Sequence, residues 1–234
     1  MRIAVVTGAS QGLGLELARR LHEEGWALVI DARRGERLEA ATKALGGGSE
    51  VLAVPGDVAN PHHREELVAA ARRLGRVSLV VNNASTLGPT PLRELLELGA
   101  GHLLEIYNVN TVAPLALVAA LRGDLAEGAT VLNITSDAGA EPYAGWGGYG
   151  SSKAALEHAS AVLALEEPAL RVLVVDPGDM RTEMHAAAFP GEDISDRPEA
   201  ASVVPALLAL IEGGQPSGRY LASTLLEEQR EATR

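Results

Sequence analysis

The sequence predicts a doubly wound α/β fold, with a parallel sheet of about seven strands and helices on both faces. Short runs of apolar, often β-branched residues alternate with longer helical patterns along the whole chain, which is the order that parallel sheets require. The composition is 47% hydrophobic but only 3% aromatic, so the core is built from Ala, Val and Leu. Such residues suit strands that helices cover on both faces.

Length and composition together predict one domain over residues 1–234. A chain of 234 residues is long enough for one α/β domain and shorter than two domains usually need. No shift in composition marks a boundary between two domains. A strand and a glycine-rich turn follow Met1 closely, so we expect no signal peptide.

Charge and cysteine content exclude several classes of protein. The net charge is −11 and there is no Cys. Because an acidic surface repels nucleic acid and anionic membranes, we expect neither as a partner. The absence of Cys excludes disulfides, thiolate nucleophiles and Cys-ligated metals, and it fits a cytoplasmic location. We also expect no uninterrupted apolar stretch of about 18 residues that could span a bilayer.

The first strand, residues 2–6, leads directly into a glycine-rich turn and then a helical pattern. Gly8, Gly12 and Gly14 lie in this turn. Glycines let the chain turn sharply and let a pyrophosphate approach the N–H groups at a helix N-terminus, where the helix dipole also favours an anion. This context indicates a nucleotide site; the alternative is a glycine-rich connection that binds no ligand.

The second strand, residues 27–30, ends in charged residues that bear on the choice of nucleotide. Asp31 and Arg33 both follow it, and at this point a carboxylate favours a ribose 2′-hydroxyl whereas an arginine favours a 2′-phosphate. A helix at 36–45 and a third strand at 51–54 precede Asp57. Asp57 either accepts a hydrogen bond from an adenine amino group or stabilises the turn.

The later strands also bring polar residues to their carboxyl ends, where open α/β sheets bind ligands. We expect strands at 77–81, 130–134, 172–175 and 218–221, helices at 62–74, 99–121, 149–167 and 199–211, and a frayed helix in the tail, 225–234. The loop between Thr182 and Pro198 is polar and contains Pro and Gly, which fits a mobile lid. Asn110, inside a predicted helix, either bridges packed elements or holds an ordered water. The six histidines lack a third ligand at a recognisable spacing, so we expect them to be solvated and to bind no metal.

Tyr149 and Lys153 are the candidate reactive pair. They lie four residues apart at the start of a long Ala/Leu-rich run, so in a helix they share one face, with Cβ atoms roughly 5–6 Å apart. A nearby ammonium favours the phenolate and lowers the pKa of a tyrosine, which suits proton transfer to a carbonyl or from an alcohol. The plain alternative is a surface Tyr that lies along a Lys side chain.

Together these residues resemble the short-chain dehydrogenase/reductase superfamily over essentially the whole chain. The stretch Thr7 to Gly14 resembles its TGxxxGxG cofactor turn, Asn82 to Ala84 its strand-four motif, and Pro177-Gly178 with Thr182 its nicotinamide-side loop. Asn110, Ser136, Tyr149 and Lys153 resemble its catalytic tetrad. The resemblance implies a Rossmann-like fold and an NAD(P)-dependent oxidoreductase that interconverts a carbonyl and an alcohol of a small molecule.

The resemblance also implies a role for each residue. Tyr149 is the general acid/base, Lys153 lowers its pKa and holds the nicotinamide ribose, and Ser136 hydrogen-bonds the substrate oxygen. Asn110 holds a water that links Lys153 to solvent. We expect cofactor contacts from Gly8, Ser10, Gln11, Gly12, Leu13, Gly14, Arg33, Asp57, Val58, Asn83, Ala84, Tyr149, Lys153, Pro177, Gly178 and Thr182.

The expected cofactor is NADP(H) rather than NAD(H). Members of this family that prefer NAD usually have an acidic residue at the position of Ala32, and those that prefer NADP often have a base at the position of Arg33. Gln11 stands where many NADP-preferring relatives have a base, and Asp31 disfavours a phosphate if it turns inward. Ser85 replaces the usual Gly after Asn-Asn-Ala, which we expect to be tolerated.

The sequence leaves two alternative functions open. One alternative is a sensor protein that binds NAD(P) without turnover, and another is a short-chain epimerase or dehydratase. Trp146 either covers the substrate or packs under the lid. By resemblance, helices 99–121 and 149–167 form a homodimer or homotetramer. Candidate substrate-lining residues are Asp137, Ala138, Tyr143, Trp146, Met180, Met184 and Phe189, and they do not identify a substrate.

Overall fold

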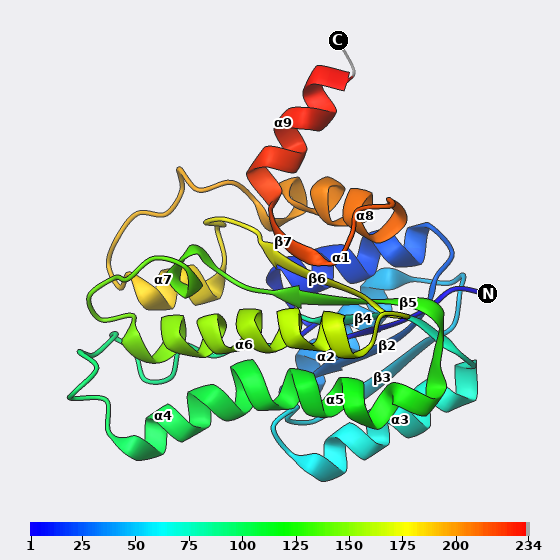
Figure 1. Cartoon of the computed structure of the whole chain (residues 1–234), viewed down its shortest axis with the longest axis horizontal. Coiled ribbons are helices and arrows are strands. Elements are labelled where there is room, and N and C mark those ends of the chain that lie inside the picture. Colours follow the sequence, from blue (N-terminus) through cyan, green and yellow to red (C-terminus); the bar gives the residue numbers. More distant parts are fainter. Residues whose placement is uncertain (233–234) are drawn as a thin grey trace.

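The central element of the computed structural model, which describes residues 1–232, is one seven-stranded parallel sheet. Its strand order is β3-β2-β1-β4-β5-β6-β7 (Figure 1). The prediction of a doubly wound parallel sheet of about seven strands is confirmed. The strands are β1 (Ile3–Val6), β2 (Ala27–Ala32), β3 (Val51–Pro55), β4 (Val77–Asn82), β5 (Leu125–Ile134), β6 (Arg171–Asp176) and β7 (Gly218–Leu221).

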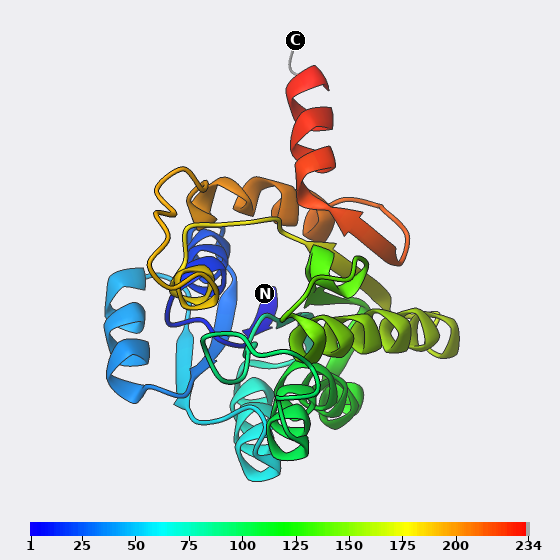
Figure 2. The ribbon, with the colours of Figure 1, turned by 90° about the vertical axis from the view of Figure 1, so that its left-hand side faces the viewer.

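Helices cover both faces of the sheet, and each face has its own core. Alternate residues of the strands point to opposite faces, so Val6 packs with residues of helices α1 and α8, whereas Val5 packs with residues of α3 and α5. Figure 2 shows the helices on either side of the sheet. The helices are α1 (Gly12–Glu23), α2 (Gly35–Leu45), α3 (Pro61–Leu74), α4 (Ala100–Tyr107), α5 (Ala113–Leu121), α6 (Gly147–Glu166), α7 (Glu183–Ala188), α8 (Val204–Glu212) and α9 (Ala222–Ala232).

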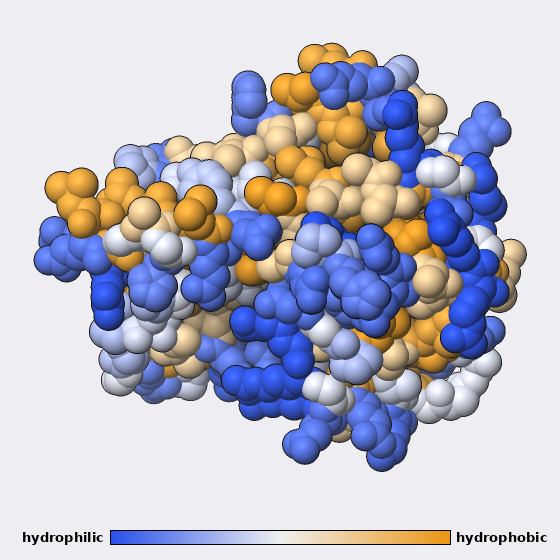
Figure 3. Space-filling view, turned by 90° about the horizontal axis from the view of Figure 1, so that it is seen from below, coloured by the Kyte–Doolittle hydropathy of each residue, from blue (hydrophilic) through white to orange (hydrophobic). Residues whose placement is uncertain are grey.

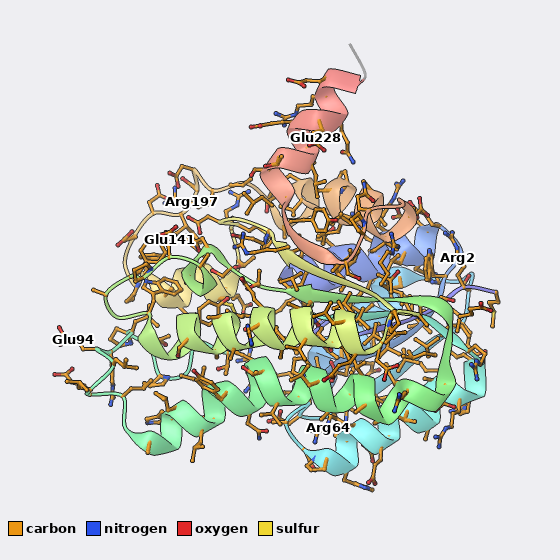
Figure 4. The ribbon with its side chains drawn as sticks, viewed as in Figure 1. Arg2, Arg64, Glu94, Glu141, Arg197 and Glu228 are labelled. Atoms are coloured by element: carbon orange, nitrogen blue, oxygen red, sulfur yellow. The ribbon has the colours of Figure 1, made fainter. Side chains whose placement is uncertain are left out.

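The strand order reverses between β1 and β4, because the chain builds outward from β1 to β3 and then returns to the other side of β1. A crevice for ligands forms at such a switch point, beyond the carboxyl ends of the strands. Figure 2 looks onto these ends. Arg2, which precedes β1, and Glu94, in the connection after β4, lie at opposite ends of the molecule (Figure 4).

One helical stretch is longer and more apolar than the sequence analysis expected. Residues Ala100–Asp124 form 25 consecutive helical residues with a mean hydropathy of 1.4, long and apolar enough by length and composition to cross a membrane. The stretch is not an uninterrupted apolar run, because His102, Glu105, Asn108 and Asn110 lie within it, so it does not contradict the expectation. Leu117 and Leu121 pack this stretch into the core beside α3, and a buried core helix passes the same test. Within it, residues 108–112 form a π-helical segment, η1.

Several boundaries differ from those predicted. β2 extends to Ala32 and β5 begins at Leu125. The predicted lid contains the short helix α7, and the predicted helix 199–211 divides into a 3₁₀ turn, Ala200–Ser202, and α8. The predicted tail helix is α9, which projects from the body of the molecule (Figure 1). Residues 233 and 234 of that tail lie outside the described residues.

Two of the six histidines are buried, contrary to the expectation that all are solvated. His22 lies under the glycine-rich turn before β3, with its Nε2 atom 3.3 Å from the position that a Cβ would take at Gly48. His63 is buried on α3. Among residues 1–232, no group of three or more His, Cys, Asp or Glu side chains could hold a metal ion.

Candidate active site

A cleft of about 520 Å³ opens at the carboxyl ends of the strands. Its walls include the glycine turn, the end of β2, the turn after β4, the start of α6 and the segment that leads from β6 into α7. All the sequence-predicted site residues line it except Gly14 and Asn110, which lie behind its wall. The topology therefore gathers residues from position 8 to position 182 into one site.

The glycine turn has the backbone geometry that a pyrophosphate site needs. Gly8 and Gly12 have φ angles of 68° and 55°, in the left-handed region that residues with a Cβ rarely adopt. At Gly14 a Cβ would lie 2.4 Å from the side-chain nitrogen of Asn83, so only glycine fits there. The turn passes directly into α1, whose N-terminal N–H groups favour an anion.

Asn83 and Thr7 hold the glycine turn against the end of β4. Asn83 donates from Nδ2 to the carbonyl oxygens of Thr7 and Gly8, at 3.0 and 3.2 Å. The Thr7 hydroxyl accepts from the backbone N–H groups of Asn83 and Ala84. The side chain of Asn83 is thus structural in this structure, although the residue also borders the cleft.

At the end of the cleft beside β2, Arg33 and Asp31 lie in different surroundings. The Arg33 side chain is exposed on the cleft wall and has no hydrogen-bond or ion-pair partner among residues 1–232. Asp31 is only 2% exposed; its Oδ1 accepts from Gly8 N at 2.7 Å and its Oδ2 lies 3.0 Å from His63 Nε2. Both carboxylate oxygens of Asp31 are therefore engaged within the protein.

Gln11 takes part in a contact that links three segments around this end of the cleft. Arg37, on α2, donates from Nη1 to Gln11 Oε1 and to both carboxylate oxygens of Glu183, the latter at 2.8 and 2.9 Å. The Arg37 guanidinium is the main reason why the pKa of Glu183 is lowered. Arg37 thereby joins the glycine turn, α2 and α7, and its guanidinium lies beside Gln11.

Asp57 and Val58 complete this end. Asp57 Oδ1 accepts from Ala59 N at 2.9 Å, so the carboxylate stabilises the turn before α3, which is one of the two roles left open. Val58 is buried against Val109 and Ala113.

Tyr149 and Lys153 lie in the first turns of α6, as their spacing predicts. Both side chains are buried, and the Lys153 Nζ atom lies 5.5 Å from the centroid of the Tyr149 ring. Lys153 donates to the carbonyl oxygen of Ile134, at the end of β5, at 2.8 Å. Gly150 lets α6 approach this region, because a Cβ there would lie 2.4 Å from the carbonyl oxygen of Ala138.

The electrostatics of this pair differ from the expectation. Burial raises the pKa of Tyr149 to about 12, although hydrogen bonds to Ser136 and Ser85 act to lower it. Burial lowers the pKa of Lys153 to about 8, against the effect of the Glu157 carboxylate. Without a cofactor, the desolvation cost of a buried phenolate is therefore larger than the stabilisation that the nearby Lys153 ammonium provides. The predicted lowering of the Tyr149 pKa is wrong for this state.

Ser136 and Ser85 both lie within hydrogen-bond reach of the Tyr149 hydroxyl. The Ser136 hydroxyl also donates to Asp137 Oδ1 at 2.8 Å. Ser85, where Gly is usual in the family, donates to Asn110 Oδ1 at 3.1 Å. The sequence analysis treated Ser85 only as a tolerated departure and missed its contact with the tyrosine.

Asn110 lies in the π-helical segment and its side chain is fully engaged by protein groups. Nδ2 donates to Thr86 O and to Ser152 Oγ, both at 2.9 Å, and Oδ1 accepts from Thr86 N at 2.8 Å as well as from Ser85. These four bonds fill the capacity of an amide. The side chain is therefore a bridge between the turn after β4 and α6, which favours packing over the holding of a water.

A charged network that the sequence analysis did not predict lies beneath the reactive pair. Glu157, one helical turn after Lys153, accepts from the Thr135 hydroxyl at 2.6 Å and from Arg219 Nε at 3.1 Å. Arg219, on β7, also donates to Asp176 Oδ2 at 3.2 Å. Burial raises the pKa of Asp176, against the hydrogen bond from Gly178 N and the charge of Arg219.

The nicotinamide-side loop begins at Asp176 and ends in α7. Gly178 has a φ angle of 74° and donates its N–H to Asp176 Oδ1. The Thr182 hydroxyl caps α7 by accepting from His185 N at 3.2 Å. A Cβ at Gly12 would meet Thr182 Cγ2 at 3.5 Å, so this loop lies directly over the glycine turn.

The substrate end is mostly apolar. Trp146 contacts Tyr149 edge to face at 5.7 Å and Phe189, just after α7, at 5.8 Å between ring centroids, so it packs under the lid as well as bordering the cleft. Asp137 provides a carboxylate there, and it hydrogen-bonds to Tyr143. Of the candidate lining residues, Asp137, Trp146, Met180 and Met184 border the cleft, whereas Ala138, Tyr143 and Phe189 do not.

The fold and this cleft are those of a doubly wound, dinucleotide-binding protein. The family model for short-chain dehydrogenases matches residues 2–193. Tropinone reductase-like 3 from Erythroxylum coca is 34% identical over 196 residues, which cover 82% of this chain and 75% of that protein. The chain belongs to the short-chain dehydrogenase/reductase family.

Solved structures agree with this assignment. A structure described as a short-chain dehydrogenase from Pseudomonas syringae superposes on this chain with a TM-score of 0.88 and 29% identity, covering 94% of each chain. A short-chain dehydrogenase from Shigella flexneri 2a strain 301, complexed with NADP, superposes with a TM-score of 0.86 and 28% identity, covering 95% of this chain and 97% of that one.

Proposed function

We propose that this protein is an NADPH-dependent carbonyl reductase in which Tyr149 is the general acid/base. The observation that carries the proposal is the position of Tyr149. It lies buried beside Ser136 and Lys153 in a cleft whose other end has a glycine turn and an exposed arginine, Arg33, without a partner among residues 1–232. Family membership sets the reaction class, and the arrangement of the side chains supports this particular chemistry.

Tyr149 and Ser136 have different roles at the substrate oxygen. A bound nicotinamide cofactor supplies the hydride for reduction or accepts it for oxidation. Tyr149 donates its hydroxyl proton to the carbonyl oxygen during reduction and takes it back from the alcohol in the reverse direction. Ser136, which hydrogen-bonds to Tyr149, positions the same oxygen. A pKa of about 12 keeps Tyr149 protonated at neutral pH, which is the state that reduction requires.

The residues present fit a nicotinamide dinucleotide. The glycine turn and the N-terminus of α1 suit the pyrophosphate, because Gly8 and Gly12 have no side chain that would keep a ligand from the backbone. Lys153 would hold the nicotinamide ribose, and the segment from Pro177 to Thr182 would border the ring. The cleft brings these groups together.

Three observations support NADP(H) over NAD(H). Arg33 is exposed on the cleft wall without a partner among residues 1–232, so its guanidinium is available to a phosphate. The two oxygens of Asp31 are engaged by Gly8 and His63. Arg37, which is ion-paired with Glu183, lies against Gln11 and brings a guanidinium to the position where Gln11 has no charge.

The Tyr149→Phe variant tests the proposed role of the hydroxyl. Loss of a general acid typically lowers turnover by about 10²–10⁴-fold, so we expect kcat with NADPH and a reducible ketone or aldehyde to fall by that amount. Binding of NADPH, measured by fluorescence titration, is expected to persist. Tyr220→Phe is the matched control, since that hydroxyl bonds to Pro216 O away from the cleft. Turnover by Tyr149→Phe at the parent's rate contradicts the proposal.

A further inference from the structure

A buried histidine lies behind the adenosine end of the cleft and is not part of the catalytic constellation. His63, near the start of α3, is only 3% exposed. Its Nε2 atom lies 3.0 Å from Oδ2 of Asp31, and Oδ1 of Asp31 accepts from Gly8 N at 2.7 Å. Both oxygens of the carboxylate at the end of β2 are therefore engaged within the protein.

The ring of His63 contacts a carboxylate at each nitrogen. Its Nδ1 atom lies 3.3 Å from Oε2 of Glu66, one turn further along α3. Because an ionised carboxylate only accepts hydrogen bonds, two such neighbours favour the doubly protonated, positively charged ring. Burial acts to lower the pKa of His63, but the hydrogen bonds and charges of Asp31 and Glu66 outweigh it and raise the pKa above the usual value of 6.5.

Within residues 1–232, the main elements packed against α3 offer one titratable group, Asp31, and Asp57 in the adjoining turn accepts from Ala59 N instead. The elements that pack against α3 are α5, β1, β2 and β3. Their sequences contain no titratable side chain other than Asp31. The ring is also fixed in place, because a Cβ at Gly56 would lie 2.2 Å from its Nδ1 atom. His63 thus fills the space beneath the turn that borders the cleft at Gly56 and Asp57.

We propose that His63 determines the cofactor preference of this chain, by holding Asp31 away from the ribose and cancelling its negative charge. A carboxylate free at the end of β2 accepts a hydrogen bond from a ribose 2′-hydroxyl and repels a 2′-phosphate. With both oxygens engaged and its charge balanced by the imidazolium, Asp31 does neither. The exposed guanidinium of Arg33 then dominates this end of the cleft. The inference rests on the proposed function, because it assumes that the cleft binds nicotinamide dinucleotides.

Binding titrations of four proteins test this role. Dissociation constants for NADPH and NADH are measured by calorimetry for the parent, His63→Leu, the double variant His63→Leu/Asp31→Asn, and His62→Leu. His62 is the matched control, because it is the neighbouring histidine but is exposed, and its ring lies near Glu65 and Glu66. We expect His63→Leu to shift the NADPH/NADH affinity ratio at least tenfold toward NADH. The double variant restores the ratio, since an amide carries no charge, and His62→Leu leaves it unchanged.

Equal weakening of both cofactors by His63→Leu, without restoration by Asp31→Asn, overturns the inference and leaves His63 a purely structural residue. If the parent protein binds neither cofactor, the proposed function fails and not merely this inference. The two failures are therefore distinguishable.

The parent protein provides a second test that needs no folded His63 variant. The affinity ratio is measured from pH 7 to 9.5, where the 2′-phosphate, with a second pKa of about 6, is already fully charged. Imidazole NMR signals report the protonation of His63 over the same range. Because the pKa of His63 is raised by its carboxylate neighbours, we expect the NADPH preference to fall as the ring loses its proton. A constant ratio while His63 deprotonates overturns the inference.

Discussion

Lys153 is a buried ammonium whose charge costs stability. Burial lowers its pKa from 10.5 to about 8, so between those two pH values the folded protein binds fewer protons than the unfolded chain. By linkage, the cost of the charge is fully present below pH 8 and disappears as the pH rises to 10.5. A shift of this size corresponds to a few kcal/mol at neutral pH. The buried charge of Lys153 is therefore expected to destabilise the fold at neutral pH.

The Lys153→Met variant tests this account. Removing the buried charge is expected to raise the free energy of unfolding at pH 7 by about 2 kcal/mol, after allowance for the lost hydrogen bond to Ile134 O. Chemical denaturation at several pH values measures it, and the gain should shrink between pH 8 and 10.5. Lys43→Met, on the exposed side of α2, is the control and should change stability by less than about 0.5 kcal/mol. A destabilised Lys153→Met variant at pH 7 contradicts the expectation.

At the scale of single residues, the sequence predicted positions better than environments. The spacing of Tyr149 and Lys153 placed both on one helix face, because that relation is local. The partner of His63 is Asp31, 32 residues away, and no local pattern marks that contact. The effect of burial on the Tyr149 pKa is likewise a property of the packed site and not of the motif.

At the scale of elements, apolar patterns predicted every strand and most helices. A buried parallel strand such as residues 77–81 is a continuous apolar run bounded by polar turns, and that signal is contained in the run itself. The helix α7 was missed because its six residues lie between Gly- and Pro-containing segments. The π-helical segment around Asn110 was also missed, since one extra residue in a helical turn leaves the apolar pattern nearly unchanged.

Helices α4 and α6 carry exposed apolar side chains that are candidates for contact between copies of this chain. Leu104 on α4 and Val162 on α6 are exposed, and Leu165 on α6 is 84% exposed. Of the small residues on α6, Ala161 is exposed, whereas Ala154, Ala155 and Ala159 are half-buried. Figure 3 shows apolar areas between hydrophilic ones on the side of the molecule seen from below in Figure 1. We propose that α4 and α6 form the interface of a homodimer or homotetramer.

The Leu165→Glu variant tests this interface. Burial of a leucine side chain contributes about 1.5–3 kcal/mol, so a buried charge at this position should shift the oligomer toward monomer. Light scattering at micromolar concentration measures the mass. The control is Leu96→Glu, in the connection before α4, where the side chain is 99% exposed and no change is expected. A parent protein that is already monomeric at this concentration contradicts the proposed interface.

At the scale of the whole molecule, the charge is distributed unevenly. The net charge is −11, yet Arg33, Arg34 and Arg37 gather at the end of β2 and the start of α2, beside the cleft. An acidic surface around a local positive region favours a ligand whose negative charge lies at one end. A 2′-phosphorylated adenosine has that distribution. The charge of the molecule and the geometry of the cleft thus support the same cofactor.

The most direct test of the account is a calorimetric titration of the purified protein with NADPH and, separately, with NADH. We predict saturable binding of one cofactor per chain. NADPH should bind at least tenfold more tightly than NADH, which is a difference in binding free energy of roughly 1.4 kcal/mol. Tighter binding of NADH would contradict the roles given to Arg33 and His63. Binding of neither cofactor would contradict the proposal that this cleft is the site of a nicotinamide-dependent reduction.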